Sequence, residues 1–332
     1  MTGAPAPLLR VENLRVHFPL TGGFTGRRTG AVKAVDGVSL EIGPGETVAL
    51  VGESGCGKST AGNAILGLVR ATGGRILFEG EDILAQNAPR QRALRRDMQV
   101  IFQDPVSALN PKLTVGRCIA EPLAIAGWPK AERAARVAEL LGLVGLLPGH
   151  AQRYPNELSG GQRQRVVIAR ALALNPKLII CDEPVSALDV SIRSQIVNLL
   201  MSLQAELGLS YLFIAHDLSV VRHISDRVVV MYLGTVAEEG PTDALFDHPT
   251  HPYTEALLAA IPLPDPAAQR AKPPFALEGD LPSPALPPQG CPFVTRCPER
   301  GPDCATLRPV LADTGHGSRA ACLMRLPAAR PG

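Results

Sequence analysis

Long apolar segments are missing from this 332-residue sequence. No run approaches the roughly 18 to 20 consecutive apolar residues that a helix needs to cross a bilayer, so we expect no membrane-spanning helix. Residues 1–7 have neither a basic stretch nor an apolar one, so a secretory signal is not expected either. If the molecule works at a membrane, other chains have to supply the path across it.

Excess charge and aromatic side chains are also scarce. The formal net charge is +2, and aromatic residues make up 4% of the chain. A charge balance this close to zero gives no electrostatic reason to expect binding to nucleic acid. The apolar content of 45% is ordinary for a globular core. The length allows one domain of about 250 residues and a small appendage.

One loop has the composition of a phosphate-binding site. Residues 52–60, Gly-Glu-Ser-Gly-Cys-Gly-Lys-Ser-Thr, fit the pattern G-x-x-x-x-G-K-[ST]. Glycines let consecutive backbone N–H groups turn toward phosphates, and the following helix adds the positive end of its dipole. We expect Lys58 to reach the β- and γ-phosphates of a nucleotide and the Ser59 hydroxyl to bind Mg²⁺. The residues expected to contact the nucleotide here are Gly52, Ser54, Gly55, Cys56, Gly57, Lys58, Ser59 and Thr60.

The residues around this loop have the patterns that it requires. Residues 46–51 form a short, β-branched, apolar run that is typical of a buried strand. After the loop, apolar residues recur at helical spacing over 64–69, which predicts a helix. The loop therefore lies between a strand and a helix.

A second apolar run, residues 178–181, predicts another strand, and it ends in Asp182 and Glu183. The carboxyl ends of parallel strands border the crevice where such sheets bind ligands. We therefore expect Asp182 to hold Mg²⁺ and Glu183 to polarise an attacking water.

Four further short elements complete a series. Gln103 follows a predicted strand, Leu-Ser-Gly-Gly-Gln occupies residues 158–162, Ser-Ala-Leu-Asp occupies 186–189, and His216 follows another predicted strand. In this order and spacing, and together with the phosphate loop and the two acids, they resemble the ATP-binding subunits of ABC transporters. The resemblance covers roughly residues 8–260.

The resemblance implies that ATP is held between the phosphate loop of one subunit and the 158–162 element of a second, arranged head to tail. Ser159, Gly160 and Gly161 begin a helix predicted over 162–174, so their backbone N–H groups form a second anion-binding end. That end has no phosphate to bind within its own subunit, which implies a partner. ATP then closes the pair of subunits and hydrolysis reopens it.

The same resemblance assigns roles to single residues. Gln103 is expected to contact Mg²⁺ and the attacking water and to report the γ-phosphate to a membrane subunit. His216 is expected to hold the γ-phosphate, so that Glu183, His216 and Gln103 form the catalytic set. Gln162 is expected to bind nucleotide with the rest of its element, and Asp189 to bridge the dimer. The expected ligands of Mg²⁺ are Ser59, Gln103 and Asp182.

One contact of the family has no obvious counterpart. ABC subunits stack an aromatic ring on adenine shortly before the position of Ala34 here, and Thr29 or its neighbours occupy that place. Phe18 and Phe24 are the candidates, and the sequence does not decide between them.

The implied fold is α/β: a P-loop NTPase of the ABC type with a mixed core sheet, an antiparallel β part and a helical subdomain over about 112–160. The ATPase domain is expected over residues 1–260. Prolines crowd residues 261–288 and the periodicity is lost, so we predict a linker there. A small Cys-rich domain is expected over 289–326.

Three features resemble the oligopeptide/dipeptide importer group, which also serves nickel and glutathione. They are the segment 103–111 after the glutamine, the His-Pro segment 248–262, and the cysteine-bearing tail. His248 and His251 are separated by prolines, so they are not expected to bind a metal. By residue chemistry alone the His-Pro segment is equally well a capped surface helix.

Four of the seven cysteines lie in the last 42 residues, spaced C-x5-C-x6-C-x17-C. A cytosolic protein keeps its thiols reduced, so clustered cysteines favour a metal over disulfides. The spacing lacks the C-x2-C pairs of zinc ribbons, and two Cys-Pro steps are typical of iron–sulfur ligation. The resemblance suggests a [4Fe–4S] cluster, with Zn²⁺ or no metal as alternatives. The ligands would be Cys291, Cys297, Cys304 and Cys322.

The sequence therefore predicts a subunit that binds and hydrolyses ATP to energise import of di- and oligopeptides through a separate pair of membrane permeases. The expected partners are a second ATPase subunit, by preference a paralogue that makes a heterodimer, and, indirectly, an extracytoplasmic solute-binding protein. We expect a peripheral location on the cytoplasmic face of the cell membrane. Import of nickel or glutathione is the nearest alternative, and a soluble ABC ATPase acting on nucleic acid or ribosomes is the alternative of another class.

Overall fold

The computed structural model describes residues 6–22, 27–262, 270, 279 and 282–331. The chain divides into two compact units, each of which is described by itself. The first unit comprises Met1–Leu8, Ile42–Thr47 and Asp82–Ile214, and the second comprises Leu9–Glu41, Val48–Glu81 and Ala215–Gly332.

Three parallel strands form the centre of the first unit. They are β6 (Met98–Ile101), β7 (Leu178–Asp182) and β8 (Ser210–Ala215), with β7 in the middle. Every residue of β8 is buried, as expected for a strand covered on both faces. The register pairs Ile101 with Cys181 and Asp182 with Ile214, so residues that follow β6 and β7 emerge at the same edge.

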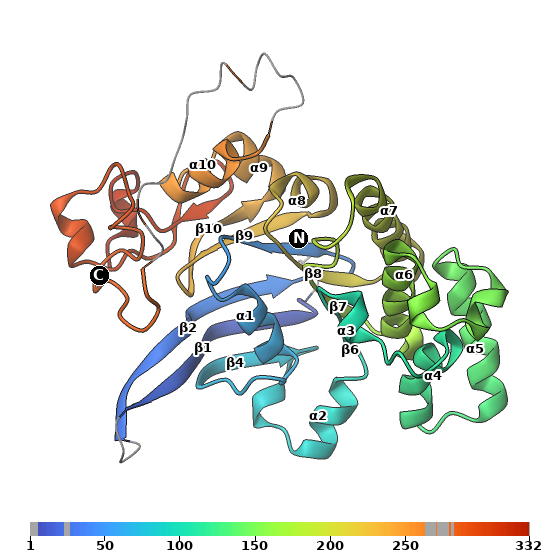
Figure 1. Ribbon diagram of the computed structural model, residues 1–332. Helices are drawn as coiled ribbons and strands as arrows, with labels where there is room; N and C mark the ends of the chain where they lie inside the picture. Colours follow the sequence, from blue (N-terminus) through green and yellow to red (C-terminus); the bar gives the residue numbers. More distant parts are fainter. Residues whose placement is uncertain (1–5, 23–26, 263–269, 271–278, 280–281, 332) are drawn as a thin grey trace. The chain divides into compact units, whose positions relative to one another are not determined.

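Helices make up most of the rest of the first unit, and several of them lie together on the right of Figure 1. Arg170 ties three of them together, because its guanidinium donates to the Glu121 carboxylate of a second helix at 2.7 Å and to the Ala108 carbonyl of a third at 2.8 Å. The last helix ends at Leu207, and the next residue, Gly208, has a φ of 66°, the left-handed geometry that stops a helix. The helices are α2 (Ala88–Leu94), α3 (Pro105–Ala108), α4 (Val115–Ile125), α5 (Lys130–Leu143), α6 (Gly160–Ala171) and α7 (Val190–Leu207).

The second unit contains an antiparallel part with two long strands side by side, β1 (Leu9–Gly22) and β2 (Arg27–Ile42) (Figure 1). The strand β4 (Gly73–Phe78) pairs with β1 on the other side, and the short β5 (Glu81–Asp82) is next to β4. The β1–β4 register shifts between Glu12 and Arg15, where Asn13 has a φ of 49°. A bulge of this kind bends a strand and increases its twist.

The second unit also carries the strand before the phosphate loop. The strand order is β11-β12-β10-β9-β3, in which β3 and β9 are parallel and the other pairs are antiparallel. The C-terminal segment contributes β11 and β12, so it extends this sheet beyond β10. The strands are β3 (Thr47–Val51), β9 (Arg227–Tyr232), β10 (Thr235–Pro241), β11 (Ala312–Asp313) and β12 (Arg319–Ala320); the helices are α1 (Lys58–Ile65), α8 (Leu218–Ile224), α9 (Thr242–Asp247) and α10 (Pro252–Ala259).

The predicted elements agree with the structure except at some ends. The helix expected over 64–69 ends at Ile65, and Leu68 lies beyond it with 59% of its surface exposed, so that part of the prediction was wrong. The helix expected over 162–174 begins two residues earlier, at Gly160, and its last turn is a 3₁₀ turn at Leu172–Leu174. Most of the proline-rich segment predicted to be a linker lies outside the described residues.

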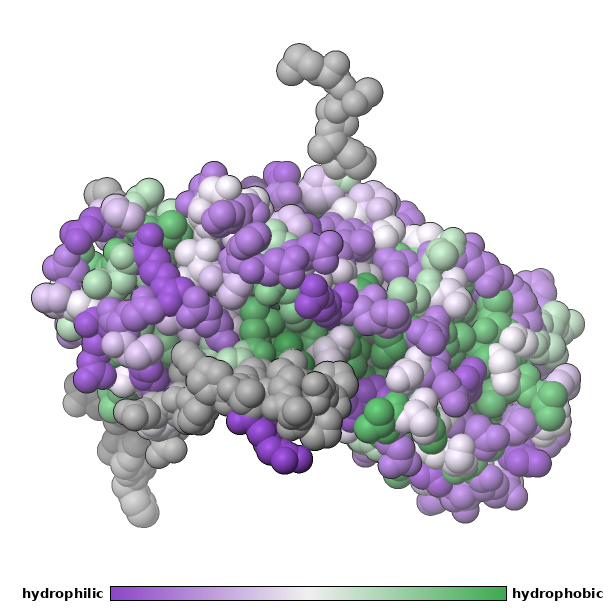
Figure 2. Space-filling model, turned by 90° about the horizontal axis from the view of Figure 1, so that it is seen from above, coloured by the Kyte–Doolittle hydropathy of each residue, from purple (hydrophilic) through white to green (hydrophobic). Residues whose placement is uncertain are grey.

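Within the part of the chain that the structure describes, no helix combines the length and the apolar character needed to cross a bilayer. The face shown in Figure 2 is largely hydrophilic, and its hydrophobic residues gather in patches between the polar ones.

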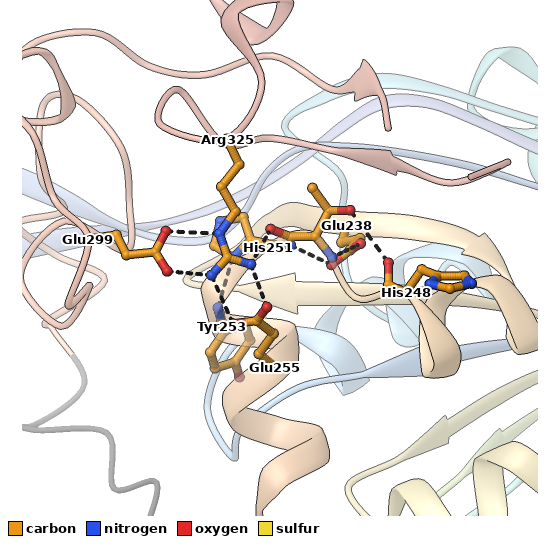
Figure 3. Close-up of polar contacts among 8 residues, drawn as sticks. Glu238, His248, His251, Tyr253, Glu255, Glu299 and Arg325 are labelled. Carbon is orange, nitrogen blue, oxygen red and sulfur yellow. Dashed lines mark hydrogen bonds and ion pairs between the residues drawn. The ribbon is translucent and has the colours of Figure 1, made fainter. Parts of the chain in front are cut away.

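A buried polar cluster holds the His-Pro segment in the second unit (Figure 3). The carboxylate of Glu238 accepts hydrogen bonds from the backbone N–H of Thr250 at 2.8 Å and of His251 at 2.9 Å. His251 precedes α10, and its Nδ1 accepts from the N–H of Tyr253 at 3.1 Å, which caps the helix. The capped helix that residue chemistry left open as one interpretation of this segment is present, although His251 is buried rather than on the surface.

A tail arginine completes the cluster. Arg325 donates to Glu255 of α10 at 2.5 and 2.9 Å, and to Glu299 at 2.8 Å and through a second nitrogen (Figure 3). Its guanidinium also donates to the Thr250 carbonyl at 3.1 Å. The C-terminal segment is thus bound to α10 through paired charges, which are stronger than neutral hydrogen bonds.

The titration of His251 gives a testable pH dependence. Burial lowers its pKa to about 4 from 6.5, with the Arg325 charge acting in the same direction and the Glu299 charge opposing. Between these values the unfolded chain binds the proton and the folded chain does not, so the free energy of unfolding rises with pH across this window. A pKa shift of this size corresponds to a contribution of about 3 kcal/mol to the free energy of unfolding. This contribution is fully present above the pKa of the unfolded chain and is lost as the pH falls toward 4.

We therefore expect the stability difference between the wild type and His251→Asn to change by about 3 kcal/mol between pH 6.5 and 4. Asparagine can still cap α10, but it does not titrate. Urea unfolding at several pH values measures this difference. A difference that stays constant over the window would contradict the account.

Candidate functional site

The phosphate loop lies between a buried strand and a helix, as the sequence predicts. All five residues of β3 are buried, and α1 begins directly after the loop at Lys58. Gly57 precedes the helix with a φ of 105°, which side chains rarely tolerate. Ser54, Gly55 and Ser59 are exposed, so they can face a ligand.

Two glycines of the loop lie against neighbouring backbone. A Cβ at Gly57 would lie 2.0 Å from the carbonyl oxygen of Ala34, and one at Gly52 would lie 2.2 Å from that of Met231. Gly55 has a φ of 82° but nothing within 4 Å of such a Cβ. Gly52 and Gly57 therefore have to be glycine because a side chain would not fit, and Gly55 only because of its backbone conformation.

The Lys58 ammonium is held inside the loop. Its Nζ donates to the carbonyl oxygens of Gly52 at 2.8 Å and Glu53 at 2.9 Å, and only 5% of the residue is exposed. A phosphate oxygen could replace these neutral acceptors and would form a stronger, charge-assisted bond. Cys56 is buried, its N–H donates to the Glu53 carbonyl at 3.3 Å, and burial raises the pKa of its thiol. Its side chain is therefore part of the packing, so only its backbone is a candidate to contact a nucleotide.

In the first unit the structure brings Gln103 and Glu183 together. Gln103 follows β6 and Glu183 follows β7, and the Gln103 Nε2 donates to the Glu183 Oε2 at 2.9 Å. The backbone N–H of Glu183 donates to the Ile214 carbonyl of β8 at 3.0 Å. Glu183 has a φ of 48°, a left-handed conformation that costs free energy in a non-glycine residue and is concentrated at functional sites.

The other predicted residues lie at strand or helix ends. Asp182 is the last residue of β7 and is half-buried, beside Glu183 in the chain. His216 follows β8 and is exposed. Asp189 precedes α7, is exposed, and its side chain does not cap that helix. Asp182 and Gln103 of the first unit carry oxygen donors of the kind that Mg²⁺ prefers. The third expected ligand, the Ser59 hydroxyl, is also an oxygen donor and belongs to the second unit.

The 158–162 element begins α6 with a reciprocal cap. The Ser159 Oγ accepts from the Gln162 N–H at 3.3 Å, and the Gln162 Oε1 accepts from the Ser159 N–H at 3.1 Å. Gly160 and Ser159 are exposed. Gly161 is buried against α7, where a Cβ would lie 2.7 Å from the Ile192 Cγ2. The exposed end of a twelve-residue helix is thus fixed in place and open to an anion.

The four tail cysteines are buried but do not form a ready metal site. Burial raises the pKa of the Cys291 thiol to about 12, and the charges of the other three cysteines add to this effect. The Cys291 N–H also donates to the Cys304 carbonyl at 2.8 Å. Among the described residues, however, no three His, Cys, Asp or Glu side chains are placed to hold one metal ion. The geometry therefore does not support the expected iron–sulfur cluster.

The adenine contact remains unassigned. Phe24 lies outside the described residues, and Phe18 belongs to β1 with 43% of its surface exposed. Nothing is described of the side chain of Thr29.

Two residues that contact the phosphate loop were missed by the sequence analysis. Arg296 pairs with the Glu53 carboxylate, and the Tyr253 hydroxyl accepts from the Glu53 N–H. Arg296 lies 243 residues after Glu53, and no repeat or motif links the two positions. The only available signal was their place in two segments already singled out, the Cys-rich tail and the His-Pro segment.

Comparison with known proteins gives two family matches. Residues 35–186 match the family model described as "ABC transporter". Residues 237–304 match the model described as "Oligopeptide/dipeptide transporter, C-terminal region". The second match includes the His-Pro segment and three of the four tail cysteines.

Curated relatives agree with these matches. An oligopeptide transport ATP-binding protein of Salmonella typhimurium is 56% identical over 92% of each chain. A putative oligopeptide transport ATP-binding protein of Bacillus subtilis is 50% identical over 95% of each. A glutathione import ATP-binding protein of Escherichia coli is 58% identical over 83% of this chain, but that match spans 44% of the longer protein.

Solved structures share the fold. Part of an ABC transporter complex from Clostridium perfringens superposes with a TM-score of 0.63 and 30% identity, over 73% of this chain and 91% of that one. A dimeric ATP-binding cassette in a post-hydrolysis state, bound to ADP and Pi, superposes with a TM-score of 0.62 and 32% identity, over 70% of this chain and 98% of that one.

Proposed function

Because the chain belongs to the ATP-binding subunits of ABC transporters, in the oligopeptide transport group, we propose that it hydrolyses ATP to energise the import of di- and oligopeptides through a separate pair of membrane permeases. The observation that carries the hydrolytic part is the contact between Gln103 and Glu183 at 2.9 Å. It joins a group that can sense a phosphate to the carboxylate that can activate water, at one edge of a parallel sheet.

The phosphate loop binds the ATP phosphates in this proposal. Lys58 would exchange its two carbonyl acceptors for phosphate oxygens. Ser59, Gln103 and Asp182 would hold Mg²⁺, which would neutralise part of the phosphate charge. Glu183 accepts a hydrogen bond from the attacking water and orients it, and His216 holds the γ-phosphate. These residues provide positioning and charge, which are the main demands of phosphoryl transfer.

A second ATPase subunit completes the site. The exposed end of α6 at Ser159 and Gly160 binds the γ-phosphate of ATP held by the partner, and Asp189 contacts the partner at the dimer interface. The support is that this helix end is capped, exposed and rich in glycine, and that a similar cassette is a dimer. We assign the partner to a paralogue, and the two subunits to the cytoplasmic face of the membrane.

The domain division follows the same proposal. The ATPase domain occupies residues 1–260 with its helical subdomain at about 112–160, a linker spans 261–288, and the Cys-rich domain spans 289–326. The solute-binding protein delivers peptide to the permeases and does not touch this chain. Glutathione import is the second candidate for the cargo, because a glutathione import protein is 58% identical.

Replacing Glu183 by Gln should abolish ATP turnover in the purified transporter complex and leave ATP binding in place, because the amide cannot accept a proton or orient water as the carboxylate does. Glu206→Gln, at an exposed position of α7, is the matched control and should hydrolyse ATP normally. Undiminished hydrolysis by Glu183→Gln would remove Glu183 from the mechanism.

The tail cysteines bind one metal centre in this proposal, a [4Fe–4S] cluster in preference to Zn²⁺. The support is that burial and, after it, the charges of the other three tail cysteines raise the pKa of the Cys291 thiol, an effect that a bound cation would oppose, and that prolines follow Cys291 and Cys297. The thiols have to come closer together than the structure has them, since no three converge among the described side chains.

Anaerobic purification with iron, sulfide and zinc analysis tests the metal centre. We expect about four irons per chain, lost in Cys297→Ser and kept in Cys118→Ser, whose thiol is buried in the first unit. Stoichiometric zinc in place of iron would mean that the metal centre is Zn²⁺ and not an iron–sulfur cluster. A chain that carries no metal under these conditions would contradict the proposal.

A further inference from the structure

The phosphate loop carries a negative charge of its own. Glu53 is its second residue, and its carboxylate is paired with Arg296 of the Cys-rich tail. The Arg296 guanidinium donates two parallel hydrogen bonds to this carboxylate, from Nη1 to Oε2 at 2.6 Å and from Nη2 to Oε1 at 3.0 Å. The Arg296 side chain is 7% exposed and that of Glu53 30%. The pair is therefore largely removed from water, and both residues belong to the second unit.

The backbone of the same residue is held as well. The Glu53 N–H donates to the Tyr253 hydroxyl at 2.8 Å. Tyr253 is fully buried at the start of α10, and its ring packs against those of Tyr232 at 4.7 Å and Phe293 at 5.4 Å. The loop is thus fixed at Glu53 by a side chain from the His-Pro segment and by another from the tail.

The tail fixes the position of Arg296 through local packing. The Arg296 N–H donates to the Phe293 carbonyl at 3.1 Å, and Phe293 is buried with its ring against those of Tyr232 and Tyr253. The hydrogen bonds to Glu53 raise the pKa of Arg296 further, so it stays charged. The guanidinium is therefore already in place before any ligand binds.

A carboxylate in a loop that binds polyphosphate repels its ligand unless a cation neutralises it. Like charges a few ångströms apart interact strongly where water is partly excluded. Lys58 cannot neutralise Glu53 and bind phosphate at once without dividing its charge between them. Arg296 supplies the second cation, and it comes from a domain outside the motif.

We propose that Arg296 is a positioning residue for nucleotide binding, which neutralises Glu53 and holds the first half of the phosphate loop in its binding conformation, so that the docked tail sets the affinity for ATP. The inference rests on the proposed function, in that the loop is taken to bind ATP. It predicts that ATP affinity depends on a residue of the tail that does not itself touch the nucleotide.

The test is equilibrium binding of MgADP to the full-length chain and its variants by calorimetry. Arg296→Gln should weaken binding about tenfold, because it leaves the Glu53 charge unpaired in the loop. The double variant Glu53→Gln with Arg296→Gln removes both charges and should bind within about threefold of the wild type. This rescue separates an electrostatic role from a structural one, which the second substitution would not repair.

Arg308→Gln is the matched control. Arg308 also joins the tail to another part of the second unit, Asp36 of β2 at 3.0 Å, but it has no contact with the phosphate loop among the interactions described. Its loss should leave affinity unchanged. If Arg296→Gln does not fold, Arg296→Lys keeps the charge without the paired geometry and should bind within about threefold of the wild type.

Four outcomes would overturn the inference: normal affinity in Arg296→Gln, no rescue in the double variant, an equal loss in Arg308→Gln, or a tenfold loss in Arg296→Lys. Lys58→Ala distinguishes a failure of the proposed function. If Lys58→Ala binds MgADP like the wild type, the loop is not the nucleotide site, whatever the Arg296 variants do.

Discussion

A polyanion binds to a protein loop only if N–H groups and cations point at it and no unpaired carboxylate opposes it. The loop at residues 52–60 meets this requirement with help from much of the second unit. Gly57 lies against the Ala34 carbonyl and Gly52 against that of Met231, so the path of the backbone is fixed by neighbouring segments. The Gly234 N–H donates to the Cys56 carbonyl at 2.9 Å, which adds a further anchor.

The C-terminal segment is part of this support. It extends the sheet through β12, where Ala320 pairs with Glu238 of β10. Paired charges hold it at several points, among them Arg319 with Glu239 at 2.8 Å and Arg325 with Glu255. An exposed pair such as Arg319 with Glu239 contributes little, but Arg296 and the cluster around His251, to which Arg325 belongs, are largely buried, and their loss leaves groups without partners. The tail and the nucleotide-binding loop are therefore expected to respond to each other.

Local patterns in the sequence predicted most elements that surround the site. The strands β3 and β7 follow short apolar runs that are typical of strands, and α6 lies where a helix was predicted over 162–174. The family motifs placed Gln103 and Glu183, and the structure joins them. The pairing of Glu53 with Arg296 was not predictable, because a long-range ion pair leaves no periodic signal.

In the tail, too, sequence patterns do not show which distant residues come together. Cysteine spacing predicts a cluster but not how the thiols converge, since 17 residues between Cys304 and Cys322 allow many paths. The end of α1 was misjudged for a different reason: Leu68 and Val69 continue the helical spacing, but Gly67 has a φ of 66° and ends the helix. Backbone conformation at a single glycine overrode the pattern of apolar residues.

The function proposed for this chain is the coupling of ATP hydrolysis to movement of peptides through other polypeptides. The most direct measurement is ATP hydrolysis by the chain reconstituted in lipid with its partner ATPase and two permeases, with and without peptide-loaded solute-binding protein. The account predicts that hydrolysis rises several-fold when the loaded binding protein is added and that it requires the permeases. Hydrolysis that is indifferent to both, or that is stimulated instead by RNA or ribosomes, would contradict it.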